Sequence, residues 1–109
     1  MRIISQKKLK DYITLLKSKG SADHAAVKAA LESWYAEAKK AAWASPAEVK
    51  RQYANASIDA NEREVVNIKG NDYRMLVSIR YDIKLVFVIW IGTHTEYDNI
   101  DVRTVRHVP

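Results

Sequence analysis

The chain has 109 residues, the size of one domain, and its 48% hydrophobic and 28% charged residues are a globular composition. The absence of cysteine excludes disulfides, thiolate catalysis and cysteine-ligated zinc, and no apolar run approaches the roughly 20 residues of a membrane span. The net charge of +5 is typical of small domains that meet a polyanion, although many basic domains bind nothing anionic.

The chain begins with a predicted strand, Met1–Ile4, and Ser5 is the predicted cap of the helix that follows. These first residues lack the apolar core of a secretory signal, so we expect a cytoplasmic protein with one domain over residues 1–109. Gly20 suits the left-handed position that ends a helix. The first helix has an apolar stripe at helical spacing, formed by Leu9, Tyr12, Ile13 and Leu16.

A second helix is predicted from a cap at Ser21 to about Ala44. A third, short helix is predicted over Pro46–Tyr53, where Ser45 and Glu48 form a capping box and proline takes the first helical position. The stripe of the second helix predicts core positions at Val27, Ala30, Leu31, Trp34, Ala38 and Ala41.

From Arg63 the hydrophobic period becomes two, and Gly70-Asn71 predicts a hairpin turn that places Asn67 opposite Arg74. One face of the hairpin is apolar and is expected in the core: Val66, Ile68, Tyr73, Met75, Val77 and Ile79. The other face is more polar and is expected to meet water or a ligand: Arg63, Val65, Asn67, Lys69, Arg74, Leu76, Ser78 and Arg80.

The next strand, Lys84–Ile91, is apolar throughout, and Gly92 predicts a bulge or bend at its end. The segment Ile100–Pro109 reads either as a further strand or as a basic tail. The predicted fold is therefore α+β, in which an N-terminal strand and helices pack on one face of a small, mainly antiparallel sheet in the order β-α-α-(α)-β-β-β.

Four polar residues are predicted to gather near one end of the polar hairpin face, and their side chains suit phosphate oxygens. A solvated sheet face is the alternative interpretation. Arg80 shares the face but lies about 20 Å along it and cannot serve the same site. The four residues are Arg63, Asn67, Lys69 and Arg74.

His94 follows the last predicted strand and is the side chain best suited to proton transfer near neutral pH, while Tyr97 could stack on a base or donate from its hydroxyl. A lone histidine after a strand is more often a surface or capping residue. The three histidines have no metal-ligand spacing, so no metal site is expected.

The block Asn67…Gly70-Asn71…Tyr73-Arg74 and the block Thr93-His94-x-Glu96-Tyr97-Asp98 resemble the HigB-type toxins of the RelE superfamily. The resemblance covers the whole chain and its element order. It implies an mRNA interferase of a type II toxin–antitoxin pair, an endoribonuclease that enters the ribosomal A site and cuts mRNA by 2′-OH attack with no metal or cofactor. The implied partner is an antitoxin of the HigA type with a helix-turn-helix DNA-binding domain.

The resemblance matches Arg74 and His94 to basic positions of RelE-type enzymes. We expect Arg74 to stabilise charge while Arg63 and Lys69 hold the RNA backbone. We expect His94 to act as acid or base, and Tyr97 to stack on a base or orient the substrate. The lysine pair on the second strand of RelE is replaced here by residues such as Val65 and Asn67, so the general base is either Lys69 or His94. The expected contacts to RNA are made by Arg63, Asn67, Asn71 and Thr93. A non-catalytic RNA- or ribosome-binding module on the same fold is the alternative function.

Overall fold

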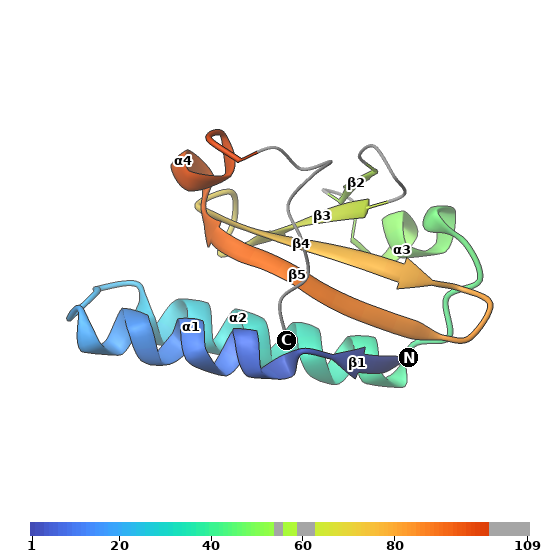
Figure 1. Cartoon of the computed structure of the whole chain (residues 1–109), viewed down its shortest axis with the longest axis horizontal. Helices are drawn as coiled ribbons and strands as arrows, with labels where there is room; N and C mark the ends of the chain where they lie inside the picture. The colour runs from blue at the N-terminus through green and yellow to red at the C-terminus, as the bar shows by residue number, and fades with distance from the viewer. Residues whose placement is uncertain (54–55, 59–62, 101–109) are drawn as a thin grey trace.

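The computed structural model describes residues 1–53, 56–58 and 63–100. The predicted alternatives for Ile100–Pro109 concern residues 101–109, which lie outside the described residues. Figure 1 shows the element order, which runs β1 (Arg2–Ile4), α1 (Gln6–Ser18), α2 (His24–Lys40), α3 (Pro46–Gln52), β2 (Ser57–Ile58), β3 (Arg63–Ile68), β4 (Tyr73–Arg80), β5 (Leu85–Thr93) and α4 (His94–Tyr97).

The strands form one sheet in the order β1-β5-β4-β3-β2. Strand β1 is parallel to β5 and the other pairs are antiparallel, so the predicted α+β class with a mainly antiparallel sheet is confirmed. Helices α1 and α2 lie side by side beneath the sheet (Figure 1). Strand β2 was not predicted because two residues are too short to show a period. No helix in the described ranges is long and apolar enough to cross a membrane.

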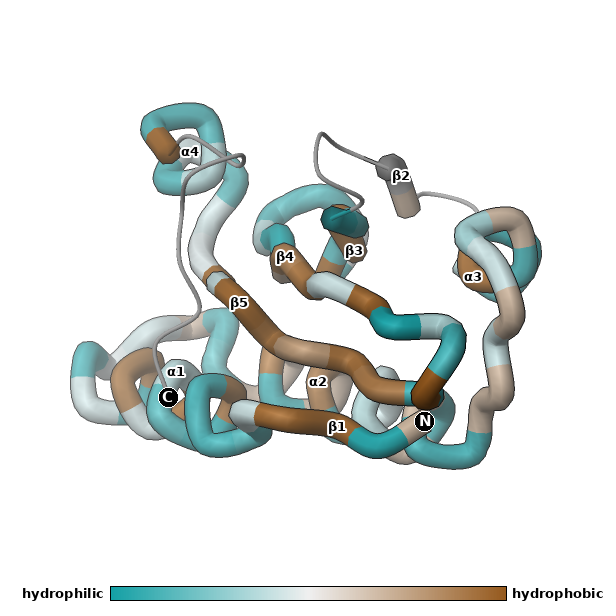
Figure 2. Tube along the Cα trace, turned by 45° about the vertical axis from the view of Figure 1, so that its right-hand side comes forward, coloured by the Kyte–Doolittle hydropathy of each residue, from teal (hydrophilic) through white to brown (hydrophobic). Residues whose placement is uncertain are grey.

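The main core lies between the sheet and the helices. All six residues of the predicted apolar hairpin face are at most 6% exposed, and they pack with the apolar stripes of α1 and α2. Figure 2 shows hydrophobic residues along most of β1 and β5. Trp34 and Trp43 are buried in this core, as their helical spacing favoured.

The hairpin register is also as predicted, because Asn67 lies opposite Arg74 and Ile68 opposite Tyr73. The turn that joins the strands is closed by the Asp72 amide, which donates to the Lys69 carbonyl over 3.2 Å. Two residues of this turn, Lys69 and Gly70, have positive φ angles of 52° and 64°.

Several helix limits differ from the prediction. Ser5 stands at the N-cap of α1, but its backbone is left-handed and its side chain makes no capping bond. Helix α2 begins three residues after Ser21, because the Ser21 hydroxyl accepts from the Asp23 amide in a local turn. It ends at Lys40 rather than near Ala44, because the chain then becomes extended and buries Trp43. Gly20 does end α1 as expected.

The predicted capping box at α3 is wrong, because Glu48 accepts from the Ala44 amide instead of the Ser45 amide. The bulge predicted at Gly92 is wrong too. It lies three residues earlier, where Val77 pairs with Val88 but Leu76 pairs with Trp90, leaving Ile89 as the extra residue. This bulge places Ile89 and Trp90 in succession on the same side of the sheet.

The second hairpin face is less polar than predicted. In its middle, Val65, Leu76 and Ile89 are at most 4% exposed and form a small second apolar cluster, against which Trp90 and Tyr97 pack. The expectation that this whole face meets water or a ligand is therefore wrong for its centre, where Val65 and Leu76 pack with Ile89 of the β5 bulge.

Glu64 on β3 is a buried carboxyl, 2% exposed, that accepts a hydrogen bond from the Tyr81 hydroxyl. Its Oε2 has no partner among the described residues, and burial raises the pKa of this carboxyl above its usual range. The folded state therefore binds a proton on the Glu64 carboxyl more tightly than the unfolded state does. Stability should be greatest below the ordinary glutamate pKa and decline as pH rises through the raised value.

We therefore expect the free energy of unfolding of the wild-type chain to rise between pH 8 and pH 5, and Glu64→Gln to lack this increment. Urea denaturation at a series of pH values measures both slopes. Equal slopes in the two proteins would show that Glu64 titrates alike in the folded and unfolded states.

Candidate functional site

Three segments meet at one end of the sheet: the β3–β4 turn, the end of β5 and helix α4. The register places Arg74 opposite Gly92 and Tyr73 opposite Thr93. The His94 amide then donates to the Asp72 carbonyl over 2.9 Å, which fixes the first residue of α4 against the turn.

Helix α4 is oriented by a capping box that the sequence reasoning missed. The Thr93 hydroxyl accepts from the Glu96 amide over 3.1 Å, and the Glu96 carboxylate accepts from the Thr93 amide over 2.8 Å. Thr93-x-x-Glu96 has the spacing of a capping box, but it follows the apolar strand directly, and no helix was predicted after this strand. Because His94 and Tyr97 are three apart, the helix presents them on neighbouring positions of one side.

Arg74 is the central cation of this site. Its guanidinium carbon lies 4.8 Å from the centroid of the Tyr97 ring, a cation–π contact. One terminal nitrogen donates to the Asn71 side-chain oxygen over a long 3.5 Å. The buried Nε of Arg74 has no hydrogen-bond partner among the described residues. The Arg74 guanidinium is thus held against the face of the Tyr97 ring, and its Nε–H remains without an acceptor among the described residues.

His94, the first residue of α4, forms a pair with Asp98 at the C-cap of the helix. The His94 Nε2 and an Asp98 carboxylate oxygen are 3.5 Å apart, and both side chains are about half exposed, at 45% and 58%. A carboxylate in this position orients the imidazole ring. The pair lies on the surface at the end of the sheet where Tyr97, from the same helix, contacts Arg74.

Trp90 is a further member of the site that was missed. Its ring lies 6.2 Å from the Tyr97 ring at an interplanar angle of 52°, so it supports the ring that holds Arg74. The sequence does not assign Trp90 to a face, because Lys84–Ile91 is apolar throughout and the bulge was expected at Gly92 rather than at Ile89.

Gly92 provides the space that Trp90 occupies. A Cβ added at Gly92 would come within 2.6 Å of two carbons of the Trp90 ring and 3.1 Å of a Glu96 carboxylate oxygen. We expect Gly92→Ala to lower the free energy of unfolding by about 1–3 kcal/mol, the usual cost of overpacking, as measured by urea denaturation. Adding Trp90→Leu should recover most of this loss. A double variant as destabilised as the sum of the two single variants would contradict the proposed clash.

Lys69 does not share the face of Arg74, contrary to prediction. Its amine contacts Asp72 over 2.9 Å and Asp23 of the α2 N-cap over 3.3 Å, because the positive φ at Lys69 turns it toward the helix layer. The hydrogen bonds that the Lys69 amine donates to Asp72 and then to Asp23 raise the pKa of Lys69. The Tyr73 hydroxyl donates to the same Asp23, whose carboxyl pKa is lowered by this bond and by Lys69.

Arg63 also lies apart from Arg74. It pairs with Ser78, four residues along β4 and therefore about 13 Å away, with the Val65 cluster between them. The structure thus brings together Arg74, Asn67 and Asn71 of the hairpin with Thr93, His94 and Tyr97, and it separates Arg63 and Lys69 from them. Arg80 is engaged by Asp82 at the far end of β4.

Within the described residues, no group of three histidine or acidic side chains could hold a metal ion. A model of the HigB toxin family, described as the RelE-like toxic component of a toxin–antitoxin system, matches residues 27–100. The matched range contains all the predicted site residues. Comparison with curated proteins finds no match.

Proposed function

Because the chain belongs to the HigB family of RelE-like toxic components of toxin–antitoxin systems, we propose that it is an endoribonuclease that cuts mRNA on the translating ribosome. It would act in the cytoplasm, where a helix-turn-helix antitoxin of the HigA type would be its partner. The observation that carries this proposal is the Arg74 guanidinium, which lies against the ring of Tyr97 and whose Nε has no partner among the described residues, at the end of the sheet where α4 also carries the His94–Asp98 pair.

The proposed reaction is internal transesterification. The ribose 2′-oxygen loses its proton and attacks the adjacent phosphorus, and the bond from phosphorus to the 5′-oxygen breaks. The products are a 2′,3′-cyclic phosphate and a 5′-hydroxyl, so the proton removed is balanced by the one returned to the leaving oxygen. The nucleophile is supplied by the RNA itself, and the reaction therefore needs no metal-bound water.

His94 is the proposed proton carrier and Arg74 the cation for the pentavalent oxyanion, since a guanidinium offers two parallel donors to phosphate oxygens. Asp98 keeps the imidazole oriented. Lys69 is a poor base in this arrangement, because two carboxylates stabilise its charged form and its amine faces away from Arg74. Asn67, Asn71 and Thr93 are the proposed RNA contacts nearest to Arg74. We assign Arg63 to a more distant phosphate.

Tyr97 contributes through its ring in this proposal. Tyr97→Leu should lower the cleavage rate about two- to thirtyfold, the equivalent of a lost cation–π contact of about 0.5–2 kcal/mol, whereas Tyr97→Phe should stay within about twofold of the wild type. Single-turnover cleavage on programmed ribosomes measures both. An equal loss in Tyr97→Phe would instead assign the role to the hydroxyl group.

Primer extension tests the function directly. The chain is induced in bacteria, and one abundant mRNA is compared with a version whose start codon is removed. Growth arrest with cuts only in the translated version is the expected result. Cuts in both versions would identify a free ribonuclease. Ribosome binding that weakens with salt, without any cut ends, would favour a non-catalytic ribosome-binding module.

A further inference from the structure

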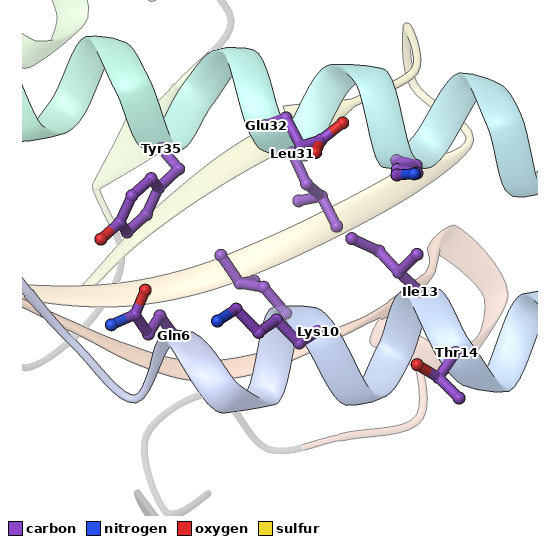
Figure 3. Close-up of a pocket in the computed structure, with 9 residues that line it drawn as sticks. Gln6, Lys10, Ile13, Thr14, Leu31, Glu32 and Tyr35 are labelled. Carbon is purple, nitrogen blue, oxygen red and sulfur yellow. The ribbon is translucent and has the colours of Figure 1, made fainter.

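A groove runs between α1 and α2 and opens away from the sheet, which lies behind the two helices in Figure 3. Its volume is about 460 Å³, within the range of ligand and peptide sites. From Gln6 to Thr14 the groove follows about 12 Å of α1. A helical segment of about two to three turns has this length.

The floor of the groove is apolar and its edges are charged. Leu9 and Leu31 are buried at the base, with Ile13 partly exposed above them. Lys10 of α1 and Lys28 of α2 stand exposed on opposite edges, and Glu32, one turn after Lys28, is the one carboxylate within the described ranges that lines the groove. No ion pair of either lysine is found among the described residues. Helix α1 carries four lysines against one aspartate, so the surroundings of the groove are basic as well.

We propose that this groove is the docking site of the antitoxin and binds an amphipathic helix that carries an apolar side chain flanked by carboxylates. The apolar floor calls for a protein side chain, since a nucleic-acid backbone offers none. Lys10 and Lys28 then meet the carboxylates on either side of that anchor. Family membership supplies the class of partner, and the proposal does not depend on the ribonuclease reaction.

The test is the affinity of the purified chain for its purified cognate antitoxin, measured by calorimetry. Lys10→Glu/Lys28→Glu should weaken binding at least tenfold, because two attractions become repulsions. Thr14→Trp, which fills the exposed end of the groove, should weaken it to a similar degree. Lys19→Glu/Lys50→Glu makes the same charge change at exposed positions outside the groove and should alter the affinity less than threefold.

Wild-type affinity in both groove variants would overturn the proposal. Equal weakening in the control variant would overturn it as well, since overall charge would then explain the attraction. Unchanged antitoxin binding with weakened ribosome binding would reassign the groove to ribosomal RNA. These results are independent of cleavage, so the docking site and the ribonuclease function can fail separately.

Discussion

Arg74→Ala should lower the rate of mRNA cleavage by roughly 100–1000-fold, the usual cost of removing one well-placed donor to a developing oxyanion. Growth arrest on induction should disappear with it. The fold should persist, because Arg74 lies near the N-terminal end of β4, and the side-chain contacts found for it among the described residues are those with Asn71 and Tyr97. Single-turnover cleavage on programmed ribosomes gives the rate, and thermal unfolding shows whether the variant is folded.

Arg80→Ala is the matched control, because Arg80 lies on the same strand and forms its ion pair with Asp82 at the opposite end. It should cleave within threefold of the wild type. Arg74→Lys should fall between the two, since lysine keeps the charge but loses the two parallel donors. Undiminished toxicity in a folded, well-expressed Arg74→Ala variant would remove Arg74 from the proposed mechanism.

His94→Gln should lower the cleavage rate by roughly 100–10,000-fold, the range observed for general acid–base groups. Glutamine preserves much of the size and hydrogen bonding of histidine but cannot carry the proton. The same ribosome assay measures the loss, and binding of the variant to ribosomes should be unchanged. His24→Gln, on the first turn of α2, is the matched control and should cleave normally.

Chemical rescue separates proton transfer from a structural role of His94. Imidazole added to the His94→Ala variant should restore part of the rate, because the small base can occupy the vacated space. Imidazole should do nothing for Arg74→Ala. A His94→Ala variant that is folded, inactive and insensitive to imidazole would indicate that His94 only positions other groups.

Much of the sheet could be predicted because its patterns are local. With a turn at Gly70-Asn71, only one pairing of β3 with β4 buries the apolar residues of both strands on the same face. The structure has this pairing. The stripes of α1 and α2 likewise identified the buried residues Leu9, Leu16, Val27 and Leu31.

The site was predicted less well because its geometry depends on a few backbone details. Because Lys69 has a positive φ, its side chain lies on the helix side of the hairpin, away from the site in which it was expected. The bulge at Ile89 decides that Trp90 and Gly92 share the face of Arg74, and an apolar strand gives no local sign of where such a bulge falls. The strand residues Arg63 and Arg74 share a face as predicted, but the distance along it keeps them apart.

Helix α4 has four residues, too few to be stable in isolation. It depends on the Thr93–Glu96 box and on the bond from the His94 amide to the Asp72 carbonyl. Amide-hydrogen exchange at His94 and Glu96 should therefore follow the local opening of the β4–β5 end as one cooperative unit. If His94 and Tyr97 act as proposed, a partner that loosens this end of the sheet would lower activity from a distance, because both side chains would lose their positions together without being covered.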